Sequence, residues 1–243
     1  MSTEITLTDQ IRVELVRSSA NDLDVVHSAR VSTLGDQLEE DLERSASDVE
    51  RDKGLIAFLM RNRHGTPFEH NSFTFRVTAP IFVWREHMRH RVGFSYNEES
   101  ARYRELQPVF YTPSHERAIV QVGTPGEYRF EVGFDEQYEL IDESFEYCFQ
   151  ASYSAYEDLL ASGVAREVAR MVLPTAIMTT AYVTCNARSL MSFLSLRTFH
   201  EDSIFPSYPQ AEIEMVASQY EQHFAASMPL TYAAFIASGR VAP

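Results

Sequence analysis

Hydrophobic and polar residues alternate along two stretches of the chain and recur at helical spacing along several others. The alternation over 11–15 and 73–78 predicts half-buried strands. Cap residues and apolar positions three and four apart predict helices over 21–32, 48–62, 81–90, 137–160, 186–197 and from 209 to 224. Such a mixture of helices and strands is typical of an α/β or α+β domain.

Proline and polar residues mark the connections between these elements. Pro108 interrupts the extended stretch 103–111, which favours an edge strand or a bulge. A short helix through 166–170 stops before Pro174. The polar, acidic stretch 33–46 is typical of a solvated loop or a short exposed helix.

Two of the helices carry specific signals. Ser47 followed by Glu50 predicts a capping box at the start of the helix over 48–62. Asn186 predicts a cap for the helix over 186–197, whose apolar stripe ends on Arg197. A guanidinium on a core-facing stripe is costly unless it is paired, so we expect an anionic group to face Arg197.

Composition is ordinary for a globular protein. The chain has 243 residues, of which 44% are hydrophobic and 23% charged, which suits one domain over 1–243. No stretch approaches the roughly 18 apolar residues of a membrane span, and the first residues lack the features of a signal peptide. Two cysteines are too few for a disulfide framework. We therefore expect a soluble, cytoplasmic protein without a membrane partner.

The formal net charge of −14 argues against binding nucleic acid, because an acidic surface repels phosphate backbones. Against that background the basic residues are unusual, since Lys53 is the single lysine among 21 basic residues. Several of the arginines crowd together in sequence, at positions 85, 89, 91, 102 and 104. An acidic protein with such a cluster is expected to have a local basic site.

The densest part of this cluster is the segment 89–103, which begins at the end of a helix and runs into a strand. Planar guanidinium groups beside Ser95, Asn97 and Ser100 suit bidentate binding of a phosphate and of the amide edge of a heterocycle. We interpret the segment as a nucleotide site. The alternative is a network of salt bridges between these arginines and Glu86, Glu98 and Glu99.

The same segment resembles the signature of the flavin-dependent thymidylate synthases, which is Arg-His-Arg, seven residues and Ser. This chain has Arg89-His90-Arg91, eight residues and Ser100, with the extra residue within 92–94. Other blocks resemble the family in the same order, at 64–70, 79–83, 165–174 and 186–197, with a weaker similarity at 29–32. Glu86 and Ser192 depart from the family pattern, where Gln and Asn are frequent, and the stretch 198–208 is longer than usual.

This resemblance implies a fold and a reaction. The fold is α+β, a central, mostly antiparallel sheet with flanking helices. The reaction is the reductive methylation of dUMP to dTMP, with 5,10-methylenetetrahydrofolate as the one-carbon donor and FAD, reduced by NADPH, as the hydride donor. The resemblance also implies a homotetramer with active sites shared between subunits, and dUMP and the folate as small-molecule partners. We expect no metal.

The resemblance also assigns residues, position by position. To FAD it assigns Ser32, Thr66, Arg89, His90, Arg91, Glu98, Asn186, Ala187, Arg188 and Ser192. To dUMP it assigns Glu86, His87, Met88, Arg89, Glu98, Glu99, Ser100, Ala101, Arg102, Arg170 and Arg197.

The cysteines agree with a reaction that needs no thiol. A thiolate nucleophile must be accessible and have a lowered pKa. Cys148 lies on the expected apolar face of an aromatic helix and Cys185 ends an apolar run, so we expect both in the core. Without a thiol, dUMP can be activated by a fixed cation that stabilises its ring after loss of the imide proton, a catalytic role that Arg197 suits.

Three other functions compete with this hypothesis. His87 and His90, with Glu86 beside them and further histidines at 64 and 70, could suggest a metal site, although two permanent cations at Arg89 and Arg91 oppose a divalent ion. An NADPH-dependent flavoprotein oxidoreductase would share the FAD contacts but would not transfer a methyl group. A non-enzymatic acidic scaffold would bind no flavin at all.

Overall fold

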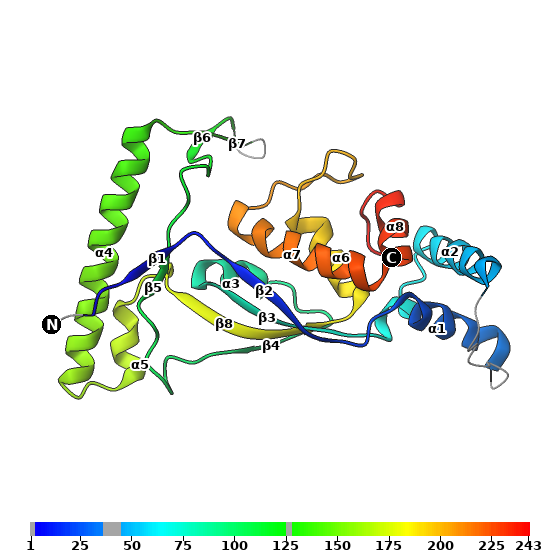
Figure 1. The fold of residues 1–243 in the computed structure, drawn as a ribbon, viewed down its shortest axis with the longest axis horizontal. Helices are drawn as coiled ribbons and strands as arrows, with labels where there is room; N and C mark the ends of the chain where they lie inside the picture. The colour runs from blue at the N-terminus through cyan, green and yellow to red at the C-terminus, as the bar shows by residue number, and fades with distance from the viewer. Residues whose placement is uncertain (1–2, 36–44, 125–127) are drawn as a thin grey trace. The chain divides into compact units, whose positions relative to one another are not determined.

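A computed structural model describes residues 3–35, 45–124 and 128–243 (Figure 1). Contacts between residues divide the chain into two compact units. Unit 1 contains residues 1–10, 78–84 and 98–180. Unit 2 contains residues 11–77, 85–97 and 181–243. The expectation of one domain over 1–243 stays a prediction.

Unit 1 is built around the long helix α4 (Asp135–Ala161). Aromatic side chains of α4 pack on a small core that includes Phe110 and Ile177. Its other elements are short: β1 (Thr6–Thr8) pairs in parallel with β5 (Val109–Tyr111), β6 (Val120–Val122) pairs antiparallel with β7 (Arg129–Glu131), and α5 (Arg166–Ala169) leads into η3 (Arg170–Val172). The short helix expected through 166–170 is confirmed, and the extended stretch 103–111 contains only the three residues of β5.

The buried face of α4 differs from the expected one. Phe149, Tyr153 and Tyr156 are buried, with Tyr138 at the start of the helix. Cys148 lies one position away from this stripe and is exposed, so the expectation that it lies in the core is wrong. Cys185 is buried in unit 2, as expected.

Unit 2 holds most of a four-stranded sheet with the order β2 (Arg12–Ser18), β3 (Phe73–Pro80), β8 (Met178–Cys185) and β4 (Phe94–Glu98). Hydroxyl contacts join Thr74 to Thr184 and Thr78 to Thr180. Because one residue number rises as the other falls, β3 and β8 are antiparallel. The expected antiparallel sheet with flanking helices is therefore confirmed, as are the strands expected over 11–15 and 73–78.

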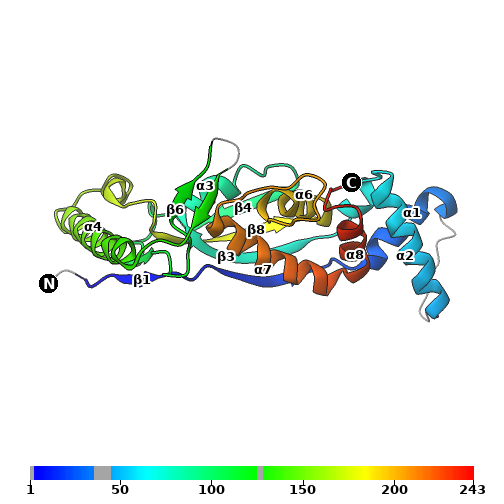
Figure 2. The same ribbon diagram turned by 90° about the horizontal axis from the view of Figure 1, so that it is seen from above.

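One face of this sheet is covered by α6 (Ala187–Arg197) and α7 (Ala211–Ser227), as both views show (Figures 1 and 2). Phe73 and Phe75 of β3 point to α7, where their rings contact those of Phe224 and Tyr220. Beside them, α8 (Pro229–Ala237) packs against α2 (Ala46–Arg61), and α1 (Asp22–Leu34) lies next to η2 (Thr66–Glu69).

Capping residues explain where several helices begin. Asn21 and Asn186 accept backbone N–H groups at the starts of α1 and α6, which confirms both as caps. The capping box of α2 joins Ser45 to Asp48, two residues before the predicted pair Ser47 and Glu50, so that assignment is wrong. Most of the stretch 33–46, namely 36–44, lies outside the described residues.

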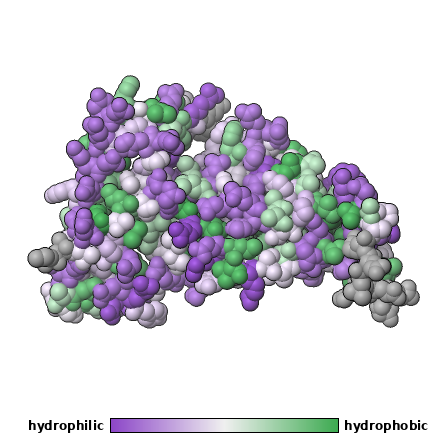
Figure 3. Space-filling model, viewed as in Figure 1, coloured by the Kyte–Doolittle hydropathy of each residue, from purple (hydrophilic) through white to green (hydrophobic). Residues whose placement is uncertain are grey.

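The surface in view in Figure 3 is largely hydrophilic, with hydrophobic side chains in small groups. Among the helices that the structure describes, none has the length and apolar character that crossing a bilayer requires.

Candidate active site

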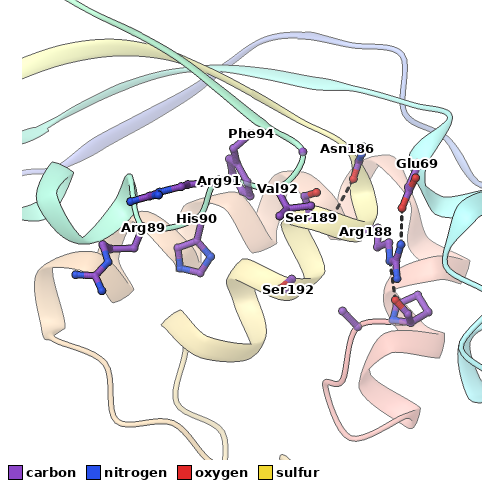
Figure 4. A pocket seen from close by; sticks show the side chains of 13 residues that line it. Glu69, Arg89, His90, Arg91, Val92, Phe94, Asn186, Arg188, Ser189 and Ser192 are labelled. Carbon is purple, nitrogen blue, oxygen red and sulfur yellow. Dashed lines mark hydrogen bonds and ion pairs between the residues drawn. The ribbon is translucent and has the colours of Figure 1, made fainter.

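The triplet Arg89, His90 and Arg91 lines a cavity of about 610 Å³ within unit 2, which we call the triplet pocket (Figure 4). The triplet follows α3 (Ile81–His87), which ends three residues earlier than expected. Opposite the triplet lie side chains of α6, among them Arg188 and Ser192. The other lining residues are Glu69, Val92, Gly93, Phe94, Asn186, Ser189, Ala242 and Pro243.

Gly93 allows the segment after the triplet to pass close to α6. Its φ is +70°, a left-handed conformation that glycine adopts without strain. A Cβ at this position would lie 2.0 Å from the Oγ of Ser189 and 3.3 Å from the Nδ2 of Asn186. At Gly93 the chain therefore approaches α6 more closely than a residue with a Cβ could without displacement.

Arg188 is held at the opposite wall of the pocket. Its Nη1 pairs with Glu69 of η2, and its Nε donates to the backbone oxygen of Pro243 at 2.7 Å. Gly65 leaves room for this guanidinium, since a Cβ there would lie 2.4 Å from its Cζ. Arg89 and Arg91, in contrast, have no ion pair within the residues that the structure describes, so their charge is available to a ligand.

Arg197 at the end of α6 has the anionic neighbour that its place on an apolar stripe predicts. Its Nη1 pairs with the carboxylate of Glu86, and its Nε donates to the Nε2 of His90 at 3.0 Å. The Arg197 side chain is only 14% exposed. The guanidinium is thus held at two points, and Glu86 acts here as its counter-ion.

Burial keeps both histidines of this region neutral. It lowers the pKa of His87 to about 3, with further lowering by His90 and Arg197. It also lowers the pKa of His90 to about 4, and the charge of Arg197 lowers that pKa further. A neutral His90 can accept the hydrogen bond from Arg197, which a protonated ring could not.

A second cavity, of about 470 Å³, lies within unit 1, and we call it the Arg170 pocket. Arg170 has no ion pair among the described residues, while Glu98 accepts a hydrogen bond from Thr179 at 2.7 Å. Glu99 accepts the backbone N–H of Thr180 at 2.9 Å. The pocket is lined by Ile81, Glu98, Glu99, Ser100, Ala101, Leu106, Arg170, Met171, Leu173, Ile177 and Thr179.

Most of the residues that the resemblance assigns to FAD or to dUMP lie in one or the other of these two pockets. Six of the FAD residues line the triplet pocket: Arg89, His90, Arg91, Asn186, Arg188 and Ser192. Five of the dUMP residues line the Arg170 pocket: Glu98, Glu99, Ser100, Ala101 and Arg170. Glu98, which was assigned to both ligands, lies in the second group.

The remaining assigned residues line neither pocket. The side chain of His87 is fully buried, and Ala187 is buried with its N–H bonded to Asn71. Arg102 forms an exposed pair with Glu167. Ser32 and Thr66 are exposed, and Met88 is half-buried. The ligand roles of all these residues stay predictions.

The alternatives can be compared with this geometry. The salt-bridge network exists in part, since Glu86 pairs with Arg197 and Glu99 with Arg104, but it leaves Arg89, Arg91 and Arg170 without a carboxylate among the described residues. Within the described part of the chain, no three His, Cys, Asp or Glu side chains gather as ligands for a metal ion.

Comparison with known proteins shows the family. The family model for the thymidylate synthase complementing protein, Thy1, matches residues 14–230. A flavin-dependent thymidylate synthase of Streptomyces coelicolor is 58% identical over 240 residues, which cover 99% of this chain and 96% of that protein. One of Tropheryma whipplei is 56% identical over 236 residues, covering 96% and 95%. The chain belongs to the flavin-dependent thymidylate synthase family.

A solved structure has the same fold. The crystal structure of the UMP/dUMP methylase PolB from Streptomyces cacaoi, bound with 5-Br dUMP, aligns with a TM-score of 0.91 and 51% identity, covering 98% of this chain and all of that one. The same methylase bound with 5-Br UMP gives a TM-score of 0.90 and 49% identity. The resemblance found in the motifs is confirmed, and with it the expectation of an enzyme, a methyltransferase, over a scaffold.

Several residues at or near the site were missed by sequence reasoning, among them Glu69, Ser189 and Tyr96. Glu69 lies within the block 64–70, and Ser189 lies beside assigned residues, but no feature of the sequence indicated that either side chain lines a pocket. Tyr96 lies two residues beyond Phe94, inside the segment interpreted as a nucleotide site. Its hydroxyl reaches back to the carbonyls of His87 and His90, a contact that only folding reveals.

Proposed function

We propose that this member of the family methylates dUMP to dTMP with a reduced flavin, and that 5,10-methylenetetrahydrofolate supplies the carbon. The observation that carries the proposal is that arginines in two pockets have no carboxylate partner within the described part of the chain, in a protein with a net charge of −14. Unpaired guanidinium groups suit phosphorylated ligands, and their cost in an empty pocket is offset when such a ligand binds.

The triplet pocket fits FAD. Arg89 and Arg91 would hold its diphosphate, while Asn186, Arg188 and Ser192 offer polar contacts from α6. The cavity of about 610 Å³ lies in the range of cofactor sites. When bound, reduced FAD supplies the hydride that completes the methyl group, and NADPH is the proposed source of that hydride.

The Arg170 pocket fits the phosphate end of a nucleotide. Arg170 and the hydroxyl of Ser100 line it, and both can donate to phosphate oxygens. Glu98 and Glu99 are already held by Thr179 and by the backbone of Thr180, so their carboxylates are fixed in orientation. The polar edge of the pyrimidine is the proposed partner of these groups.

Arg197 is the proposed catalytic residue. A fixed cation at the uracil ring favours the form that has lost its imide proton, in which carbon 5 is nucleophilic. A cysteine is not needed for this step, and neither cysteine suits one. Burial raises the pKa of the Cys185 thiol, and Cys148 does not line the Arg170 pocket of its own unit.

A homotetramer with shared active sites and a cytoplasmic location complete the proposal, on the basis of the family resemblance alone. The experiment combines flavin absorbance of the purified protein with tritium release from dUMP labelled at carbon 5. FAD, NADPH and methylenetetrahydrofolate are each omitted in turn, and UMP is offered as a competing substrate because PolB is named for both. We expect a yellow protein and release that depends on FAD. A colourless protein that releases no tritium would refute the proposal, and NADPH oxidation without methylation would favour the oxidoreductase.

A further inference from the structure

A chain of hydrogen bonds through buried His87 and Tyr220 and half-buried Tyr96 reaches the backbone of the triplet, outside both pockets. His87 at the end of α3 has no exposed surface. Its Nε2 lies 3.0 Å from the hydroxyl of Tyr220 on α7, and its Nδ1 lies 3.2 Å from the hydroxyl of Tyr96 on β4. The Tyr96 hydroxyl in turn lies 2.8 Å from the carbonyl oxygen of His90 and 3.1 Å from that of His87. All these residues belong to unit 2.

The direction of each bond follows from counting protons. A tyrosine hydroxyl has one hydrogen, and carbonyl oxygens can only accept. Tyr96 therefore donates to the backbone, and its oxygen accepts from the Nδ1–H of His87. The neutral imidazole then has an acceptor at Nε2, which takes the hydrogen of Tyr220. The chain runs in one direction, from Tyr220 through His87 and Tyr96 to the His90 carbonyl.

Burial supports this assignment. It raises the pKa of both tyrosines, so both hydroxyls keep their hydrogens, and it lowers the pKa of His87 to about 3. The ring of Phe193 packs on that of His87 with centroids 4.7 Å apart, and Tyr220 also lies against Phe193. In such apolar surroundings, losing any one of these hydrogen bonds would leave a polar atom unpaired and lower the stability of the fold. The geometry of the hydrogen-bond chain is therefore well defined.

The hydrogen-bond chain ends on the backbone of His90 and so positions the triplet. His90 is the central residue of the triplet, and Arg89 and Arg91 on either side line the triplet pocket. The His90 ring is fixed by Arg197 and its backbone by Tyr96. With the central residue held at both ends, its neighbours project from an anchored backbone. Tyr96, His87 and Tyr220 do not line the pocket themselves.

We propose that Tyr96, His87 and Tyr220 are positioning residues that hold the triplet in its flavin-binding conformation. This rests on the proposed function for its ligand, but the anchoring of the triplet backbone does not depend on flavin. Because these hydrogen bonds already order the triplet segment, the segment loses less conformational entropy when a diphosphate binds. Removal of a link should therefore weaken flavin binding without removing any contact to flavin.

The test compares Tyr96→Phe and Tyr220→Phe with wild type in two measurements. Hydrogen exchange of the flavin-free protein reports the protection of the backbone over 88–97. Titration with FAD reports the dissociation constant. For Tyr96→Phe we expect faster exchange in this segment and a dissociation constant about five- to ten-fold higher, the effect of one lost hydrogen bond. Tyr220→Phe should shift both measurements in the same direction by less.

Tyr138→Phe is the matched control. The Tyr138 hydroxyl likewise donates to a backbone carbonyl, that of Arg117 at 2.7 Å, but Tyr138 belongs to unit 1. It should lose a comparable amount of stability and keep wild-type flavin affinity and exchange over 88–97. Unchanged exchange and affinity in Tyr96→Phe would overturn the proposal, as would an equal loss of affinity in Tyr138→Phe. If wild type binds no FAD, the proposed function fails, and the exchange measurement alone decides on the anchoring.

Discussion

Arg197 donates a hydrogen bond from its Nε to the Nε2 of His90 at 3.0 Å, while its Nη1 pairs with Glu86. Two of the three nitrogens of the guanidinium are thereby committed to the protein. The third, Nη2, has no hydrogen-bond partner among the described residues and is the donor left for a ligand. This arrangement joins the flavin motif to the proposed catalytic charge, because His90 is the central residue of the triplet.

Arg197→Ala should still bind flavin, more weakly because the His90 ring loses its contact with Arg197, and should lose conversion of dUMP. The missing charge acts on the pyrimidine, whereas the FAD contacts are assigned to the triplet and to the start of α6. We expect the rate of tritium release to fall at least ~100-fold, the usual effect of removing one electrostatic donor. Arg12→Ala, at a side chain that is 75% exposed, is the control and should keep full activity. Normal turnover in Arg197→Ala would remove it from the mechanism.

Glu86 should matter for stability as the counter-ion of Arg197. Glu86→Ala leaves a largely buried guanidinium without its charge partner, and we expect a loss of about 1–3 kcal/mol in the free energy of unfolding. Glu86→Gln keeps an acceptor and should lose less. Urea unfolding measures both, with Glu167→Ala as a control in the exposed pair with Arg102, where the loss should stay below about 1 kcal/mol. Equal stability of Glu86→Ala and wild type would show that the pair contributes nothing.

The sequence predicted the parts of the fold that are set by local chemistry. Asn21 and Asn186 cap their helices, and the strands over 11–15 and 73–78 follow their alternating pattern. Arg197 was expected to face an anion because burial of an unpaired charge is costly, and Glu86 is that anion. These predictions succeeded because each depends on residues close in sequence or, for Arg197, on the large free-energy cost of burying an unpaired charge.

Other features depend on contacts that no local pattern contains. Strand β8 was missed because its polar threonines pair with those of β3, far away in sequence. Cys148 was placed in the core because the buried stripe of α4 lies one position away from the apolar pattern expected. The division of the assigned residues between two pockets and the contact of Tyr96 with His90 likewise arise from tertiary packing.

Gly93→Ala should disturb the triplet pocket more than it disturbs the fold. The new methyl group meets the Oγ of Ser189 at 2.0 Å, so the segment after the triplet must move. We expect at least ~10-fold weaker FAD binding, measured by titration, and a stability loss of more than about 1 kcal/mol. Gly163→Ala is the matched control, because Gly163 also has a positive φ but faces open space. It should show the backbone cost and unchanged FAD affinity, and equal FAD affinity in both variants would contradict the prediction.

Stability should fall as the pH drops below about 6.5. The folded protein keeps His87 and His90 neutral, with pKa values of about 3 and 4, while both titrate near 6.5 in the unfolded chain. The unfolded chain then binds protons that the folded protein refuses, so the contribution is complete above pH 6.5 and is lost towards pH 4. The limiting slope is roughly 1.4 kcal/mol per pH unit for each such histidine.

Urea unfolding between pH 7.5 and 5 measures this slope before most carboxylates titrate. His87→Gln removes one of the two groups, so its stability should depend less steeply on pH, even though the variant is less stable at every pH. Tyr138→Phe is the control, because it loses a buried hydrogen bond but no histidine and should keep the wild-type slope. If His87→Gln and wild type show the same slope, keeping the His87 ring neutral does not contribute to the pH dependence of stability. The direction assigned to the hydrogen bonds from Tyr220 to the His90 carbonyl would then lose its support.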